Sequence, residues 1–135
     1  MNIALLSGDQ ERLNLALSSA HIGTWEWDVP SDLIWWDEQM HTLFGLAAGT
    51  FTGRGEDFFV LLHEEDRERA RGEIVRTIRD CAEFDGEFRT VRPSDGSVHF
   101  LRMRWKVHYD QNAKALRIIG VAWTSPHDAA PNWLC

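Results

Sequence analysis

The stretch Gly23-Thr-Trp-Glu-Trp-Asp-Val29, together with the segment from Phe84 to Thr124, decides the fold of this chain. In the first stretch apolar and polar side chains alternate, with Trp25 and Trp27 on one side, as in a strand with one buried face. The second segment divides into three strands separated by turns, and only one short strand and helical patterns lie between the two. This order predicts one small α+β domain with a single antiparallel sheet and helices on one side.

The closing meander is expected over residues 84–92, 98–109 and 115–124. Its middle strand alternates most regularly, and one face of that strand carries Leu101, Met103, Trp105 and Val107. A short strand at 33–36 is expected to pair with the first one after the turn at 30–32.

The turn around Gly96 sets which side chains of the preceding strand share the face of that middle strand. A two-residue loop would place Phe88 there, whereas a three-residue loop with Gly96 left-handed would place Glu87 and Arg89 there. Because Pro93 suits the position just before a turn, we expect the three-residue loop, with Glu87 and Arg89 facing inward.

Helical patterns fill the start and the middle of the chain. A leading helix over 10–20 carries a stripe of small and apolar residues, namely Leu13, Ala16, Leu17 and Ala20. Asp37 is expected to cap a short helix that Gly45 closes, and a further short helix is expected over 56–62. The longest helix is expected over 66–82, with an apolar stripe of Ala70, Ile74, Ile78 and Cys81. We therefore divide the chain into a helical cap (1–22), the domain (23–125) and an unstructured tail (126–135).

Composition bounds the class of protein. The 135 residues allow one domain with a real core, and the net charge of −7 disfavours nucleic acid as a partner. Cys81 and Cys135 form neither a disulfide framework nor a metal-ligand spacing, which fits a reducing compartment, and we expect Cys81 in the core. The apolar run at 3–6 is too short for a signal peptide or a membrane span, so we expect a cytoplasmic protein with no membrane partner.

No motif indicates catalysis. A zincin needs histidines at the first and fifth positions of one helical run, but Arg67 stands fifth after His63. The chain has no Gly-x-Ser-x-Gly sequence and no paired histidines. We therefore expect a protein that is not an enzyme and holds no metal.

The aromatic set on the inward face is the best candidate for a binding site. A packed core is the favoured interpretation, and the alternative is a small ligand cavity between sheet and helices. The residues that would line it are Trp25, Trp27, Ile74, Ile78, Leu101, Met103 and Trp105, with Arg89 as the polar contact if it faces inward.

The order and spacing of several short motifs resemble the PAS sensor domain with its C-terminal PAC segment. Besides the first strand, the motifs are Trp36-Asp37-Glu38, Leu43-Phe44-Gly45, Leu62-His63-Glu64-Glu65-Asp66-Arg67, Gly86-Glu-Phe-Arg89, Pro93-Ser-Asp-Gly96-Ser97 and Ile119-Gly120-Val121. Glu64 stands where the family usually has proline. The resemblance covers residues 10–124, which is most of the chain.

This resemblance implies a five-stranded antiparallel sheet of order 2-1-5-4-3, with helices on one face and the leading helix outside. It also implies signal input or dimerisation for an attached output module, such as a histidine kinase or a diguanylate cyclase. Two departures matter: Thr124-Ser125-Pro126 replaces the family's usual Asp-Ile-Thr ending, and the cysteine motif of light-sensing relatives is absent.

We therefore expect a cytoplasmic sensory or protein-interaction module that acts as a homodimer, with or without a small-molecule ligand. Apolar surface should remain on the leading helix and the outer sheet face, at Leu13, Ala16, Leu17, Phe100, Val121 and Trp123. The alternative is a redox or gas sensor that holds haem or flavin.

Overall fold

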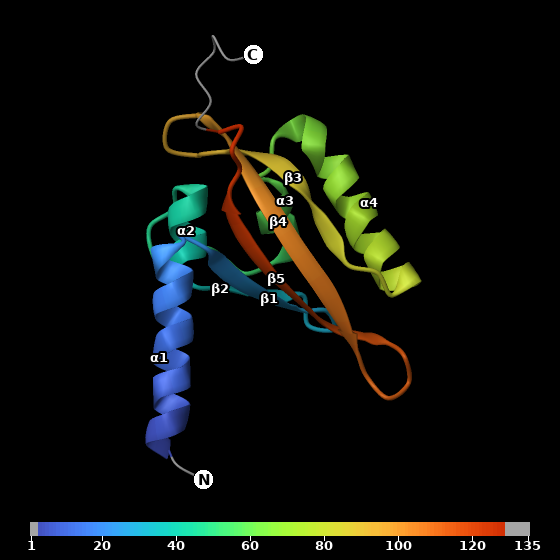
Figure 1. Cartoon of the computed structure of the whole chain (residues 1–135). Helices are drawn as coiled ribbons and strands as arrows, with labels where there is room; N and C mark the ends of the chain where they lie inside the picture. The colour runs from blue at the N-terminus through green and yellow to red at the C-terminus, as the bar shows by residue number, and fades with distance from the viewer. Residues whose placement is uncertain (1–2, 129–135) are drawn as a thin grey trace.

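Five antiparallel strands form one sheet in the order β2-β1-β5-β4-β3, as the family resemblance implies (Figure 1). This computed structural model describes residues 3–128. Its strands are β1 (Gly23–Asp28), β2 (Leu33–Trp36), β3 (Phe84–Val91), β4 (Val98–Tyr109) and β5 (Ala115–Thr124). Its helices are α1 (Ile3–Ser19), α2 (Glu38–Phe44), α3 (Gly55–Phe59) and α4 (Glu64–Asp80).

Local sequence explains where α2 begins and ends. The Asp37 carboxylate accepts a hydrogen bond from the Met40 amide at 2.9 Å, so it caps the first turn as expected. Gly45 follows the last turn in the left-handed region at φ 73°, and its amide donates to the carbonyls of His41 and Thr42. These two ends fix α2 over the end of the sheet where β1 begins and β2 ends.

The core lies between the inner face of the sheet and helices α2, α3 and α4. Alternation along β4 buries the face that carries Leu101, Met103 and Trp105, as the sequence predicts. The helices contribute buried residues such as Phe44 from α2 and Ile74 from α4. The opposite, outer face of the sheet is therefore left to polar side chains and a few apolar ones.

The prediction of a three-residue loop between β3 and β4 is wrong. Six residues, 92–97, connect the strands. The Arg92 amide donates to the Ser97 carbonyl, which leaves the four residues Pro93–Gly96 as the turn, and Phe88 pairs with Leu101 on the buried face. Gly96 is left-handed at φ 72°, as expected, but the extra loop residue restores the register that a two-residue loop would have given. Glu87 and Arg89 therefore belong to the outer-face set of β3, and neither lines the core.

Two smaller expectations also fail. Cys81 is exposed: α4 ends at Asp80, and Cys81 follows as its C-cap with a left-handed backbone at φ 52°, so it does not continue the apolar stripe of the helix. Residues 126–128, expected to begin the unstructured tail, form a turn against β3 and β4. The rest of that tail, with Cys135, lies outside the described residues.

Helix α1 leads into β1 but runs away from the sheet (Figure 1). Within residues 3–128 it packs extensively against no other helix or strand, and most of its residues from 9 to 20 are exposed. It is therefore outside the domain, as expected. In the same range no helix combines the length and the apolar character that crossing a membrane requires.

Candidate functional site

One row of residues across the sheet forms the centre of the inner face. Register pairs Trp36 with Trp25, Trp25 with Gly120, Gly120 with Trp105, and Trp105 with Phe84. A Cβ atom on Gly120 would lie 2.3 Å from the Trp25 ring, so only glycine leaves room for that ring over β5. The Trp25 and Trp105 rings then meet edge to face, with centroids 6.0 Å apart.

The cavity beside this row is very small. Its volume is about 10 Å³, and its walls are Trp25, Trp27, Ile34, Trp36, Phe58, Ile74 and Trp105. A single water molecule needs about 10–15 Å³ on the same measure. Side chains therefore fill the space in which the sequence allowed a ligand.

Two of the indole N–H groups at the cavity wall donate to protein acceptors. The Trp105 indole N–H donates to Thr77 Oγ1 at 3.0 Å, and that of Trp27 donates to Asp32 at 3.0 Å. The buried Trp25 Nε1 has no hydrogen-bond partner among the described residues. A buried donor without an acceptor usually costs free energy, so the Trp25 indole is an unsatisfied polar group at the wall of this cavity.

The expected ligand residues separate into three groups. Trp25, Trp27, Ile74 and Trp105 line the cavity. Leu101 and Met103 are buried in the core beside it, and Ile78 packs at the margin of the core while partly exposed. Sequence reasoning missed Ile34 and Trp36, although the alternation of residues 33–36 already places them on one face.

Arg89 does not reach the cavity. Its guanidinium forms an ion pair with Asp66 at 2.7 Å and extends to Glu65 at 3.3 Å, so it joins β3 to the first turn of α4. The Asp66 carboxylate also accepts the Arg89 backbone amide at 2.7 Å. Burial tends to raise the pKa of Asp66, but the hydrogen bonds and charge of Arg89 outweigh it, and the pKa lies below its ordinary value.

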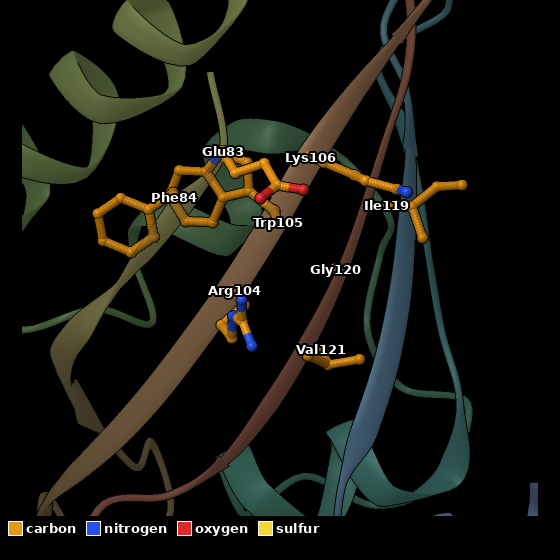
Figure 2. A pocket seen from close by; sticks show the side chains of 8 residues that line it. All are labelled: Glu83, Phe84, Arg104, Trp105, Lys106, Ile119, Gly120 and Val121. Carbon is orange, nitrogen blue, oxygen red and sulfur yellow. The ribbon is translucent and has the colours of Figure 1, made fainter. Parts of the chain in front are cut away.

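The outer sheet face carries a shallow hollow of about 260 Å³ (Figure 2). Arg104 and Lys106 line it from β4, and Ile119 and Val121 from β5. A larger hollow of about 430 Å³ adjoins it and shares Arg104 and Val121. This second hollow is also lined by Trp123 and by the residues Ala20 and Ile22 that follow α1, so the two run continuously toward the base of that helix.

The expected interface residues lie on both sides of this surface. Leu13 is 54% exposed, Ala16 is exposed and Leu17 is half-buried on α1, whereas Val121 and Trp123 are half-buried on β5. Leu15, which sequence reasoning left out, is 66% exposed, so α1 presents leucines on more than one side. The remaining expected residue, Phe100, is half-buried beneath the C-terminal turn, and its ring meets that of His127 edge to face.

The C-terminal turn at 125–128 is held by contacts to β3 and β4. Ser125 Oγ and His127 Nδ1 both hydrogen-bond the Glu87 carboxylate, the latter at 2.8 Å. The Asp128 carboxylate accepts the Phe100 amide at 2.9 Å and lies 3.1 Å from His99 Nδ1. These contacts fix the path of the chain as it leaves β5, where the usual Asp-Ile-Thr ending is absent.

The interior cavity is much smaller than a haem or a flavin. Small-molecule sites in proteins usually enclose about 300–1,000 Å³, and the cavity here is about 10 Å³. Within residues 3–128 no three His, Cys, Asp or Glu side chains are placed to hold a metal ion together. Either cofactor would require the row of aromatic side chains to move apart.

Comparison with known proteins agrees with the topology. A family described as the PAS fold matches residues 33–122. The chain is 25% identical over 111 residues to the probable diguanylate cyclase DgcE of Escherichia coli (strain K12), which covers 82% of this chain and 10% of that protein. It spans about a tenth of the length of the curated relatives it matches.

Solved structures show the same fold at lower identity. A sensory box histidine kinase/response regulator from Burkholderia thailandensis E264 superposes with a TM-score of 0.73 and 18% identity, covering 86% of each chain. A light-oxygen-voltage domain studied with a flavin analogue has a TM-score of 0.65 and 21% identity, covering 91% of each chain. With the family match over residues 33–122 and the strand order β2-β1-β5-β4-β3, these findings show that the chain belongs to the PAS-fold family.

Proposed function

We propose that this chain is the non-catalytic sensory or protein-interaction module of a larger, cytoplasmic signalling protein. A histidine kinase or a diguanylate cyclase is the proposed output domain. A probable diguanylate cyclase shares the sequence of this chain over 10% of its own length, and a sensory box histidine kinase/response regulator shares the fold. A partner or ligand that binds one arrangement of the domain better would shift the sheet, and α1 would relay the shift.

We further propose that the module works as a homodimer. The observation that carries this proposal is the unpaired apolar surface of α1 beside the outer face of β5. Within residues 3–128 α1 packs extensively against no other helix or strand, and exposed leucines on such a helix are typical of an interface. A two-fold contact would bury α1 of each protomer against the other protomer, over the hollow that contains Val121 and Trp123.

Sedimentation over a concentration series tests the dimer. We expect a dimer for the full chain and a monomer for the double variant Leu13→Glu/Leu17→Glu, because charges on that stripe cannot be buried without a partner. Val75→Glu is the matched control, since Val75 is 60% exposed on α4, away from α1. A full chain that stays monomeric at high micromolar concentration, with or without residues 1–20, would contradict the proposal.

A haem- or flavin-binding sensor remains the second candidate function. Its support is the likeness of this fold to light-oxygen-voltage domains. The filled interior weighs against it, because both cofactors are far larger than the present cavity. Optical absorption of the purified chain separates the two candidates.

A further inference from the structure

A separate hollow lies where the two ends of the domain meet. Its volume is about 190 Å³, and it shares no lining residue with the interior cavity. The connection after α1 contributes His21, α2 contributes Thr42, and the end of β5 contributes Thr124. The beginning of the β3–β4 loop contributes Arg92, and Gln39, His99 and Asp128 complete the polar part of the wall.

Arg92 is the unusual member of this wall. It is half-buried, its Nε atom is fully buried, and that atom has no hydrogen-bond partner among the described residues. Within the same residues no carboxylate lies within ion-pair distance of its guanidinium, although the chain has 21 acidic residues. An arginine held in this way keeps an unpaired charge, and because its Nε is buried, the terminal Nη atoms are the donors that it can offer to the hollow.

The fold makes room for this side chain at the end of α2. A Cβ atom on Gly45 would lie 2.5 Å from Arg92 Cδ and 2.8 Å from its Nε, so the arginine stem crosses the helix end where glycine has no side chain. Asp95 is the acidic residue of the same loop, but it accepts hydrogen bonds from Ser97, which hold its pKa below the ordinary value, with Arg92 a smaller influence. The loop therefore leaves the guanidinium free.

The remaining charge in the wall does not compete for Arg92. Asp128 is its carboxylate, and both oxygens already have donors, the Phe100 amide at 2.9 Å and His99 Nδ1 at 3.1 Å. His99 Nε2 in turn lies 3.0 Å from Ser97 Oγ. The other polar groups of the wall are the Gln39 amide, the hydroxyls of Thr42 and Thr124 and the ring of His21, and none of the three amide or hydroxyl groups carries a negative charge.

We propose that this hollow binds a small oxyanion, a phosphate or the carboxylate of a small metabolite, with Arg92 as its principal ligand. The planar guanidinium suits two parallel hydrogen bonds to either group. The hollow, at about 190 Å³, is many times larger than the space of about 10–15 Å³ that one water molecule needs. Its size also limits the ligand to a small anion. Such an anion would contact both the connection after α1, at His21, and the turn after β5, at Asp128. These two segments join the domain to the parts of the chain before and after it.

Isothermal titration of the full chain with inorganic phosphate, and separately with succinate, tests the site. Sodium chloride at matched ionic strength is the control for screening. We expect saturable binding of at least one of the two anions, and the stronger one identifies the source of the oxyanion. Arg92→Gln should weaken that binding at least about ten-fold, because a charged pair of hydrogen bonds is lost. Arg117→Gln, at an exposed arginine of β5, should leave it unchanged.

Nitrogen-15 NMR of the unaltered chain gives a second readout that does not depend on the folding of a variant. The bound anion should shift the Arg92 Nε–H resonance and the amides of Thr124 and Asp128 more than resonances elsewhere. Failure of both anions to bind beyond the chloride control, equal binding by Arg92→Gln, or shifts that avoid Arg92 would each overturn the proposal. The dimer proposal would survive any of these results, because α1 and the outer face carry it.

Discussion

At the scale of single residues, Trp105 joins the sheet to α4 by both packing and hydrogen bonding. Its ring stacks on Phe84 with centroids 4.1 Å apart, and its indole N–H donates to the buried Thr77 hydroxyl. Trp105→Ala should lower the free energy of unfolding by about 3–5 kcal/mol, as is usual for a large buried aromatic. Trp105→Phe keeps much of the packing but leaves Thr77 without its donor, so it should cost less. Denaturant unfolding measures both, and a loss below about 1 kcal/mol for the alanine variant would mean that the ring does not pack as described.

Gly120 is the residue that leaves room for the Trp25 ring in the row of aromatic side chains across the inner face. Gly120→Ala should destabilise the domain by about 1–3 kcal/mol, because the new methyl group would overlap the Trp25 ring in a packed core. Gly72→Ala is the matched control, since nothing lies within 4 Å of a Cβ there and α4 gains a better helix former. Thermal unfolding should move in opposite directions for the two variants. If Gly120→Ala were neutral, the Trp25 ring would not lie over β5.

Single residues also show how much of the candidate site can be predicted from the sequence alone. Alternation alone predicts that Trp25, Leu101, Met103 and Trp105 point inward, because each strand decides its own faces. It cannot show that Gly120 opposes Trp25, since that depends on which strands become neighbours and in which register. The role of Gly120 therefore becomes visible only once β1 and β5 are paired.

At the scale of elements, the edge of β3 shows why the loop at Gly96 was predicted wrongly. Pro93 and a left-handed Gly96 are compatible with three or four loop residues, so the local signal does not fix the register. Contacts far away in the sequence decide it: Phe88 is buried against the core, and Arg89 pairs with Asp66 of α4. The connection between α3 and α4 also covers this edge, where Leu62 pairs with Thr90.

The Asp66–Arg89 pair makes the stability of this edge depend on pH. The pKa of Asp66 is below its ordinary value of 3.8 in the folded chain, so its contribution is present above that value and is lost as the pH falls through the folded pKa. Asp66→Asn should therefore cost about 1–3 kcal/mol at pH 7, with a difference from the wild type that shrinks in acid. Denaturant unfolding at neutral and acidic pH measures this.

The control for that pair is Asp85, whose ion pair with Arg102 is solvent-exposed on the outer face. Asp85→Asn should change stability by less than about 1 kcal/mol at neutral pH, because water screens exposed pairs. An Asp66→Asn difference that stays constant from neutral to acidic pH would show that the carboxylate charge does not stabilise the edge.

At the scale of the whole molecule, the inner face of the sheet is closed and the outer face is open. Four aromatic side chains and one glycine fill the row in which a ligand was considered, and α2, α3 and α4 cover them. The unpaired apolar surface and two larger hollows lie instead at α1 and along the outer face. A third hollow lies between α2 and the C-terminal turn. The sequence predicted this fold but not the hollow around Arg92, because its residues come from five separate segments.

This closed interior leads to the last prediction, that the purified chain absorbs no light above the tryptophan band. Haem or flavin would have to replace several of the side chains that leave a cavity of only about 10 Å³, and separating them would expose tryptophans that now bury large apolar areas. Expression with haem precursor or riboflavin in the medium, followed by an absorption spectrum and native mass spectrometry, is the measurement. A Soret peak or a flavin doublet at stoichiometric occupancy would mean that the aromatic row opens for a cofactor. The cofactor-binding sensor would then replace the interaction module as the function of this domain.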